Sequence, residues 1–466
     1  MDTRTHTVLL VVFSALFAAL LFYGFPDSSA PWFDEGIHLN LARTIAEDNI
    51  FSLRTAPGEF VNEKPLLITT NFPLLFPVAL SFKLFGIGLW QAKIVMIGFL
   101  AVFAYLAYAL AKKLYGKESA LFAFALLVTF LPLYGNGKSV LGEIPGLVFF
   151  LGGLLLVHRE KEWPMFFAGI LFGLAAATKS SFLIMLGAVA VGELYAMWQR
   201  RKFDFDRVLL LSIGMSIPLL IWVGTLIPRE ITGGFLQNIV ELYRNPYAAE
   251  GTILPNIKRF FTESTPLHYA FLLLAIFISA FRRGLARLNK EEVMVLVFVA
   301  FNFIFYLSTV GWYRYFFPSH LLLLILFPGA VFSFFKSAHI RTALLFALIL
   351  VQIGVLVVNI RDRLYHNPVP REFGATANER IDNEEVAVID NPEIAFFVRS
   401  ENRRLYLRAN PRFVFGEEPF ANGRMPRFII SGMWQEHPYL NNHLKEAERY
   451  GLALSRDRYY LYELSQ

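Results

Sequence analysis

Long apolar runs without charged side chains constrain this chain more than any other feature. The run 8–25 carries no charge, and similar runs recur as far as residue 360. At about 1.5 Å of rise per residue, a helix over such a run can cross the hydrocarbon core of a bilayer. The chain has 466 residues, of which 56% are hydrophobic and 17% charged. This pattern is typical of a polytopic membrane protein rather than of a large soluble core.

Hydropathy predicts about eleven membrane-spanning helices. They are expected at residues 8–25, 89–111, 119–135, 144–158, 164–178, 181–198, 208–228, 267–281, 293–311, 315–335 and 341–359. An odd number of spans places the two termini on opposite sides of the membrane. Tyr23-Gly24-Phe25-Pro26 is a poor signal-peptidase site, so we expect the first run to remain as an uncleaved helix.

The short connections between these spans indicate the orientation. With a cytoplasmic N-terminus, every connection on the cytoplasmic side is basic. The Lys and Arg residues concerned are Lys112, Lys113, Lys117, Arg159, Lys161, Arg200, Arg201, Lys202, Arg207, Arg282, Arg283, Arg287, Lys290, Lys336 and Arg341. We therefore predict an inner (plasma) membrane protein whose C-terminus is extracytoplasmic. The net charge of +6 reflects this bias, so it does not indicate nucleic-acid binding.

Three segments are predicted to lie outside the bilayer, all on the extracytoplasmic side. The first loop, 26–88, belongs to the membrane domain 1–360 and contains an amphipathic stretch, 37–47, with helical spacing of its apolar residues. A second apolar stretch, 73–85, is too short to span and is expected to be another interfacial helix. The loop 229–266 is expected to cover a site.

The third segment, 361–466, shifts to charged and polar composition. Its size is that of a small domain. Short apolar runs at 386–389, 404–407, 428–430 and 459–462 predict strands, and the pattern at 440–450 predicts a helix. We therefore expect a small α/β domain outside the membrane. The chain contains no cysteine, so neither disulfides nor thiolate metal sites contribute.

Ionisable residues from distant parts of the chain are predicted to meet at the extracytoplasmic ends of the helices. Two adjacent carboxylates, Asp34 and Glu35, follow the first span. The other members are Lys64, Lys138, Glu143, Lys179 and Arg314. Cations suit an anionic lipid headgroup, and the Arg fork suits a phosphate. Carboxylates suit deprotonation of a hydroxyl or coordination of a divalent metal. Together they fit transfer of a group from a lipid phosphate to an acceptor.

Each of these residues also has a plainer interpretation. A lone Lys179 or Arg314 at a helix end is often a snorkelling anchor, and Glu143 suits the positive end of a helix dipole. Glu35 is a candidate helix cap. His38 and His268 are candidate metal ligands, although a single histidine is usually a polar interface residue.

The arrangement resembles the GT-C superfamily of membrane glycosyltransferases, in particular its protein O-mannosyltransferase and lipid A aminoarabinose transferase branch. The resemblance covers residues 1–335, and its motifs keep their order along the chain. They are Asp34-Glu35, Glu63-Lys64-Pro65-Leu66, Leu80 to Gly86, Glu143 before Pro145, Gly173-Leu174-Ala175, Thr178-Lys179, and Arg314-Tyr315 with Pro318. Two departures stand out: Leu66 replaces a frequent second proline, and Glu143 replaces a frequent aspartate. The substrate is therefore expected to differ from those of the known branches.

The resemblance implies a polyprenyl-phosphate-linked sugar as donor and inversion at the anomeric carbon. Asp34 would act as catalytic base or would orient the acceptor, with Glu35 beside it. Lys64 and Arg314 with Tyr315 would bind the donor phosphate, Lys179 would be a further donor contact, and Glu143 would hold sugar, acceptor or metal. The partners implied are the donor, membrane lipid, and a glycan, lipid or protein acceptor. A divalent metal is a possible cofactor.

Two other classes of function stay open from the sequence. A transporter or flippase of a lipid-linked substrate would place ionisable residues near the bilayer midplane and show internal repeats. A non-catalytic membrane assembly protein would use 361–466 as a binding module. The sugar, the acceptor, metal dependence and oligomeric state do not follow from the sequence.

Overall fold

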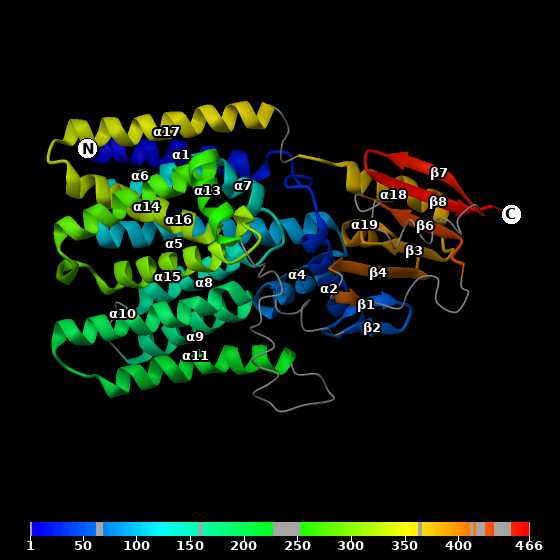
Figure 1. The fold of residues 1–466 in the computed structure, drawn as a ribbon, viewed down its shortest axis with the longest axis horizontal. Helices are drawn as coiled ribbons and strands as arrows, with labels where there is room; N and C mark the ends of the chain where they lie inside the picture. Colours follow the sequence, from blue (N-terminus) through cyan, green and yellow to red (C-terminus); the bar gives the residue numbers. More distant parts are fainter. Residues whose placement is uncertain are drawn as a thin grey trace.

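The fold is described from a computed structural model, for residues 2–61, 69–157, 162–226, 252–361, 366–410, 413–415, 425–432 and 449–465. A long helical bundle and a smaller sheet domain lie end to end (Figure 1). The N-terminus lies at the end of the bundle remote from the sheet domain, which we call the far end. The opposite end, which adjoins the sheet domain, is called the sheet end.

The bundle consists of helices joined by short turns. Its helices are α1 (Thr3–Phe22), α5 (Leu89–Tyr115), α6 (Lys117–Thr129), α7 (Leu131–Gly137), α8 (Glu143–Val157), α9 (Glu162–Thr178), α10 (Ile184–Arg200), α11 (Phe205–Leu226), α13 (Ile253–Thr262), α14 (Ser264–Arg283), α15 (Lys290–Leu307), α16 (Phe317–Phe334) and α17 (Ala338–Arg361). Three 3-10 turns, η1 (Ser180–Leu183), η2 (Leu285–Arg287) and η3 (Tyr313–Tyr315), lie between them.

Within the described residues, seven helices are long and apolar enough to cross a membrane. The number is eight if α6 and α7, which meet at a 62° bend, form one span. Pro132 at the start of α7 lacks a backbone N–H, which favours this break. Each of the eleven predicted spans falls on a helix or on this bent pair. Because α8 and α9 have only 15 and 17 residues and α15 begins with three charged residues, the exact span count stays a prediction.

Burial differs strongly among the long helices. In α16, 83% of the apolar window is buried, so this helix forms the centre of the bundle. In α1, α11 and α17 only 22% is buried, and these helices lie along the edges of the bundle (Figure 1). Apolar side chains on such outer faces are suited to lipid contact, so the chain is an integral membrane protein.

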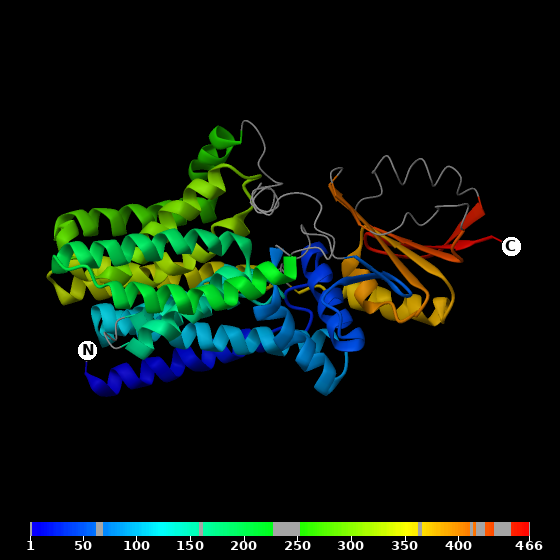
Figure 2. The same ribbon diagram turned by 90° about the horizontal axis from the view of Figure 1, so that it is seen from below.

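Two helices and a hairpin join the bundle to the sheet domain (Figure 2). They are α2 (Phe33–Asp48), α4 (Phe72–Phe85) and the strands β1 (Leu53–Ala56) and β2 (Glu59–Val61). Both predicted interfacial helices are confirmed as helices, but the surroundings of α2 differ from the prediction. Leu39 and Ala42 of α2 pack into the bundle core, whereas Ile37 and Leu41 pack into the core of the sheet domain. The helix is therefore buried on both sides.

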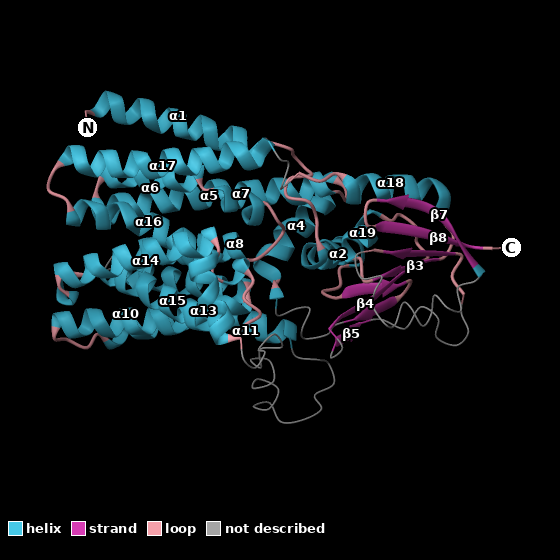
Figure 3. Ribbon diagram, turned by 45° about the horizontal axis from the view of Figure 1, so that its top comes forward, coloured by secondary structure: helices cyan, strands magenta, loops and turns pink. Residues whose placement is uncertain are grey.

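The sheet domain is a mixed six-stranded sheet with two helices (Figure 3). Its elements are α18 (Val369–Ile381), β3 (Val386–Ile389), α19 (Pro392–Phe397), β4 (Arg403–Asn410), β5 (Phe413–Phe415), β6 (Phe428–Ser431), β7 (Tyr450–Arg456) and β8 (Tyr459–Leu464). The strand order is β5-β4-β3-β6-β8-β7, with β3 parallel to both β4 and β6. Side chains of α18, α19 and α2 share one core with the strands.

The predicted α/β character of this domain is confirmed, and all four predicted strands are present. The helix predicted at 440–450 falls mostly outside the described residues, and Tyr450 begins β7 instead. Strands β5 and β7 and helices α18 and α19 were not predicted.

Candidate active site

Asp34 and Arg314 meet at the sheet end although they lie far apart in the sequence. Asp34 belongs to the first turn of α2, and Arg314 lies in η3, immediately before the central helix α16. The guanidinium of Arg314 donates a hydrogen bond to the Asp34 carboxylate. The Asp34 side chain is 23% exposed, whereas that of Arg314 is 9% exposed. The carboxylate is thus the more accessible partner of this ion pair.

Aromatic rings surround the Arg314 guanidinium. Its central carbon lies 4.8 Å from the ring centroid of Trp32, 4.5 Å from that of Trp312 and 5.4 Å from that of Tyr315. Such contacts stabilise the cation and limit its movement. The Arg314 Nε–H is buried and has no hydrogen-bond partner among the described residues, so the guanidinium keeps donor capacity in addition to its bond to Asp34.

Glu143 and Lys179 form a second ion pair beside the first. Glu143 begins α8, and Lys179 precedes η1 at the end of α9, so two neighbouring helices supply the partners. One carboxylate oxygen of Glu143 is buried and has no hydrogen-bond partner among the described residues. Arg314 and Tyr315 lie close enough to Glu143 to interact with its charge. The two ion pairs therefore form one cluster of alternating charge.

Two further polar side chains border this cluster. The Tyr315 hydroxyl is buried and interacts with the Arg314 guanidinium. His38 interacts electrostatically with Asp34, Glu143 and Lys179. Burial lowers the pKa of His38 to about 4, so its imidazole is neutral near pH 7. A neutral ring leaves the net charge of the cluster unchanged.

Glu35 points away from this cluster. Its carboxylate accepts a hydrogen bond of 2.6 Å from Lys93 Nζ on α5 and one of 2.9 Å from the Val140 N–H. Both charged side chains are almost completely buried, with exposures of 1% for Lys93 and 0% for Glu35. Burial raises the pKa of Glu35, and the Lys93 ammonium counteracts part of that effect. Glu35 makes no cap to its own helix.

The predicted residues thus separate into three groups. The structure brings together Asp34, Glu143, Lys179, Arg314 and Tyr315. It places Glu35 in a separate buried pair with Lys93. Lys64 lies outside the described residues, as does the part of the predicted covering loop at 229–251. The remainder of that loop forms α13, whose Arg259 donates to the carbonyl of Gly311 near η3.

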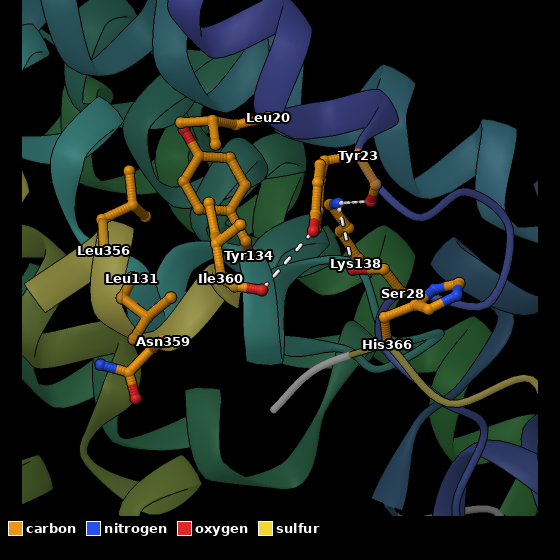
Figure 4. A pocket seen from close by; sticks show the side chains of 10 residues that line it. All are labelled: Leu20, Tyr23, Ser28, Leu131, Tyr134, Lys138, Leu356, Asn359, Ile360 and His366. Atoms are coloured by element: carbon orange, nitrogen blue, oxygen red, sulfur yellow. Dashed lines mark hydrogen bonds between the residues drawn. The ribbon is translucent and has the colours of Figure 1, made fainter. Parts of the chain in front are cut away.

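Lys138 belongs to a different pocket, formed by α1, α7 and α17 (Figure 4). Its Nζ donates to the Tyr23 carbonyl at 3.1 Å and contacts the Ser28 hydroxyl at 3.3 Å. Tyr23 ends α1, where a cation is favoured by the helix dipole. The pocket has a volume of about 30 Å³, which is enough for a water molecule but not for a sugar. Lys138 is therefore a capping residue here.

Two contacts at this end were not predicted from the sequence, although it indicated His268 as a candidate metal ligand. Lys93 lies in a predicted span, and only its charge within an apolar run signals a buried partner. His268 of α14 contacts His320 of α16 at 3.0 Å between ring nitrogens, and His320 contacts the Tyr313 hydroxyl at 3.2 Å. Within the described ranges no group of three or more His, Asp or Glu side chains is arranged to hold a metal ion.

The fold and this cluster define a class: multi-span membrane proteins with a charged site at one end of the bundle. Residues 73–223 match the model of the family described as dolichyl-phosphate-mannose-protein mannosyltransferase. No curated protein sequence matches the chain significantly.

Solved structures specify the fold further. ArnT from Cupriavidus metallidurans superposes with a TM-score of 0.67 in the apo state and 0.66 when bound to undecaprenyl phosphate. The identities are 14% and 13%, and 98% of each chain is covered in both comparisons. The Archaeoglobus fulgidus oligosaccharyltransferase gives a TM-score of 0.59 at 15% identity, covering 93% of this chain and 70% of that one. The predicted resemblance to GT-C glycosyltransferases is thereby confirmed at the level of the fold.

Proposed function

We propose that this protein is an inverting glycosyltransferase that moves a sugar from a polyprenyl-phosphate donor to an acceptor at the outer face of the membrane. The observation that supports it most directly is the Asp34–Arg314 pair beside the Glu143–Lys179 pair at one end of the bundle. The fold shared with an ArnT that binds undecaprenyl phosphate is a second support.

Arg314 is the candidate phosphate ligand. As the glycosidic bond breaks, negative charge develops on the departing phosphate, and a fixed cation stabilises that charge. The aromatic rings around Arg314 hold its guanidinium in place, and its Nε–H, which has no partner among the described residues, supplies a donor. Lys179 and the Tyr315 hydroxyl are further candidates for the donor phosphate. For Lys64 we keep the role that the resemblance implies, which is binding of the donor phosphate.

Asp34 is the candidate catalytic base. It is the most exposed of the four charged side chains in the cluster, so an acceptor hydroxyl can reach it. Its carboxylate would accept the acceptor proton while the acceptor oxygen attacks the anomeric carbon from the face opposite the phosphate. Glu143, with one oxygen unbonded among the described residues, is placed to accept a hydrogen bond from a sugar or acceptor hydroxyl.

A divalent cation, if the reaction uses one, would bind through the Asp34 and Glu143 carboxylates. One or two carboxylates together with a substrate phosphate are the usual ligand set of Mg²⁺. Such an ion would neutralise charge on the phosphate.

The orientation is part of the proposal. The residues Lys113 and Arg283, from connections that the charge bias assigns to the cytoplasm, pair with Glu291 and Glu292 at the far end. The charged site and the sheet domain lie at the other end, so in this proposal both lie outside the cytoplasm.

The test is to incubate the purified protein with a panel of polyprenyl-phosphate sugars and measure release of polyprenyl phosphate. We expect Asp34→Asn to lower the rate by about 10²- to 10⁴-fold. Asp206→Asn is the matched control, because Asp206 also lies in the first turn of a helix. If no donor in the panel is consumed but labelled donor crosses liposome membranes containing the protein, the transporter alternative replaces this proposal.

A further inference from the structure

Side chains of α2 bind both the N–H and the carbonyl of Val140. The Val140 N–H donates to Glu35 Oε1 at 2.9 Å, and the Val140 carbonyl contacts His38 Nδ1 at 2.8 Å. Glu35 and His38 lie three residues apart, so they are neighbours on one face of the helix. Because His38 is neutral near pH 7 and a carbonyl only accepts, the contact requires the tautomer with a proton on Nδ1.

Lys93 fixes the other side of the same segment. Besides Glu35, its ammonium donates to the carbonyl of Ser29 at 2.9 Å and to that of Lys138 at 3.2 Å. The hydroxyls of Ser29 and Ser139 are 2.7 Å apart. Residues 138–140 are therefore attached both to α5 and to the segment that leads into α2.

Glu143 follows Val140 by only three residues in the same segment. Immediately before Glu143, a Cβ added to Gly142 would lie 3.0 Å from Lys179 Cβ and 3.1 Å from the Thr178 carbonyl, so the backbone here is close to α9. Asp34 precedes Glu35 on α2. The bonds to Val140 consequently connect the backbone that carries Asp34 to the backbone that carries Glu143.

We infer that Glu35 and His38, together called the Val140 clamp, position Asp34 relative to Glu143, that Lys93 chiefly compensates the Glu35 charge, and that Glu35 is a positioning residue rather than a reacting one. The inference rests on the proposed function. Consecutive residues of a helix point about 100° apart, so Asp34 can face the cluster only if Glu35 faces elsewhere. Glu35 is fully buried and its charge is compensated by Lys93, which leaves no path for a substrate to reach it.

The first experiment compares substitutions that keep or remove the acceptor for the Val140 N–H. In Glu35→Gln/Lys93→Met both charges are absent, but an amide oxygen still accepts that bond. We expect this variant to retain kcat within about tenfold. We expect Glu35→Met to lower kcat by about 100-fold with little change in KM for the donor, because small misplacements of catalytic groups have effects of this size. A double variant as inactive as Asp34→Asn would overturn the inference.

The control variant is Glu193→Gln, which removes a buried, Lys290-paired carboxylate at the far end. We expect it to keep kcat per folded molecule. A comparable fall in kcat for this variant would show that any buried charge matters, which would also overturn the inference.

The second experiment measures hydrogen exchange of the peptide that contains Val140 and needs no donor. We expect exchange at least tenfold faster in Glu35→Met and close to wild type in Glu35→Gln/Lys93→Met. Unchanged exchange in Glu35→Met would exclude the clamp. If wild-type protein consumes no donor while exchange responds as expected, the proposed function fails but the clamp stands.

Discussion

The two ends of the bundle contain the same kinds of buried ion pairs but complete them differently. At the far end, Glu193 contacts both Lys290 and Arg207 at 3.2 Å. Glu292 likewise accepts from Arg283 at 2.7 Å and from the Tyr115 hydroxyl at 2.6 Å, and it also caps α15. Each of these two acids thus has more than one partner.

At the sheet end, the buried acids are not fully hydrogen-bonded. Of the buried acids in bundle ion pairs within the described ranges, Glu35 and Glu143 keep a carboxylate oxygen without a hydrogen bond. Arg314 also keeps an unbonded Nε–H, but so do Arg207 and Arg283 at the far end, so the contrast between the ends lies in the acids. A buried polar group without a partner is costly to stability. The difference indicates that the far end serves the stability of the bundle, whereas Glu143 at the sheet end retains bonding capacity for a ligand.

The largest effect that would sharpen this comparison is expected from Arg314→Met. Removal of the fixed cation should lower the rate of donor consumption by about 10²- to 10³-fold. Arg314→Lys should recover only part of that loss, since an ammonium lacks the planar fork. Steady-state release of polyprenyl phosphate measures both variants. Arg341→Met is the control, because Arg341 also stacks on a ring, that of Phe332 at 4.6 Å, outside the cluster. Equal losses in both Met variants would remove Arg314 from the phosphate site.

The second prediction compares the same substitution of one acid at each end of the bundle. Glu193→Gln should destabilise the protein by about 3–5 kcal/mol, because it leaves two buried cations without a full counter-charge. Glu143→Gln should change thermal stability less and activity much more. Thermal unfolding in detergent and donor consumption per folded molecule measure the two quantities. The comparison fails if Glu143→Gln is the more destabilised variant and its folded fraction is fully active.

The third prediction concerns the pH dependence of the sheet domain. Burial raises the pKa of Glu393 from about 4.5 to about 7. Its stabilising contribution is present below pH 4.5 and is lost as the pH rises to about 7, because the unfolded chain releases the proton first. Between pH 5 and pH 8 the free energy of unfolding should fall by about 3 kcal/mol relative to Glu393→Gln. Chemical unfolding at the two pH values measures this difference, and parallel behaviour of both proteins would contradict it.

The smallest effects are expected at two helical glycines. A Cβ at Gly36 would lie 2.2 Å from the backbone nitrogen of Glu393, so Gly36→Ala should destabilise by about 1–3 kcal/mol. A Cβ at Gly98 of α5 meets no atom within 4 Å, so Gly98→Ala should stabilise by up to about 1 kcal/mol. Melting temperatures in detergent compare the pair. A stabilising Gly36→Ala would contradict the close packing of α2 on α19.

The sequence predicted the helices, and which charged residues meet at the sheet end, better than the directions of individual side chains. Uncharged runs determine the spans directly, and Asp34 and Arg314 follow from charges at the same ends of helices. The pairing of Glu35 with Lys93 could not be predicted, because a lysine near the start of an apolar run has the same pattern as a membrane anchor. Whether Asp34 or Glu35 faces the cluster depends on the rotation of α2, which tertiary packing determines.

The contacts of α2 likewise could not be predicted from local sequence patterns. Its apolar spacing indicated one buried face, but the second face is covered by α19, more than 340 residues later. Asn40, for example, donates to the Pro392 carbonyl at 2.8 Å. Such a contact has no signal in a sequence window around residue 40.

The shared burial of α2 has a consequence for biosynthesis. Ile37 and Leu41 of this helix are translated more than 340 residues before the strands of the sheet domain that complete their core, so they must wait for those strands. Contacts between such distant segments form slowly, because a long loop must close first. A nascent chain stopped before residue 386 would therefore expose this apolar surface, and residues 386–464 complete the burial of a helix made much earlier.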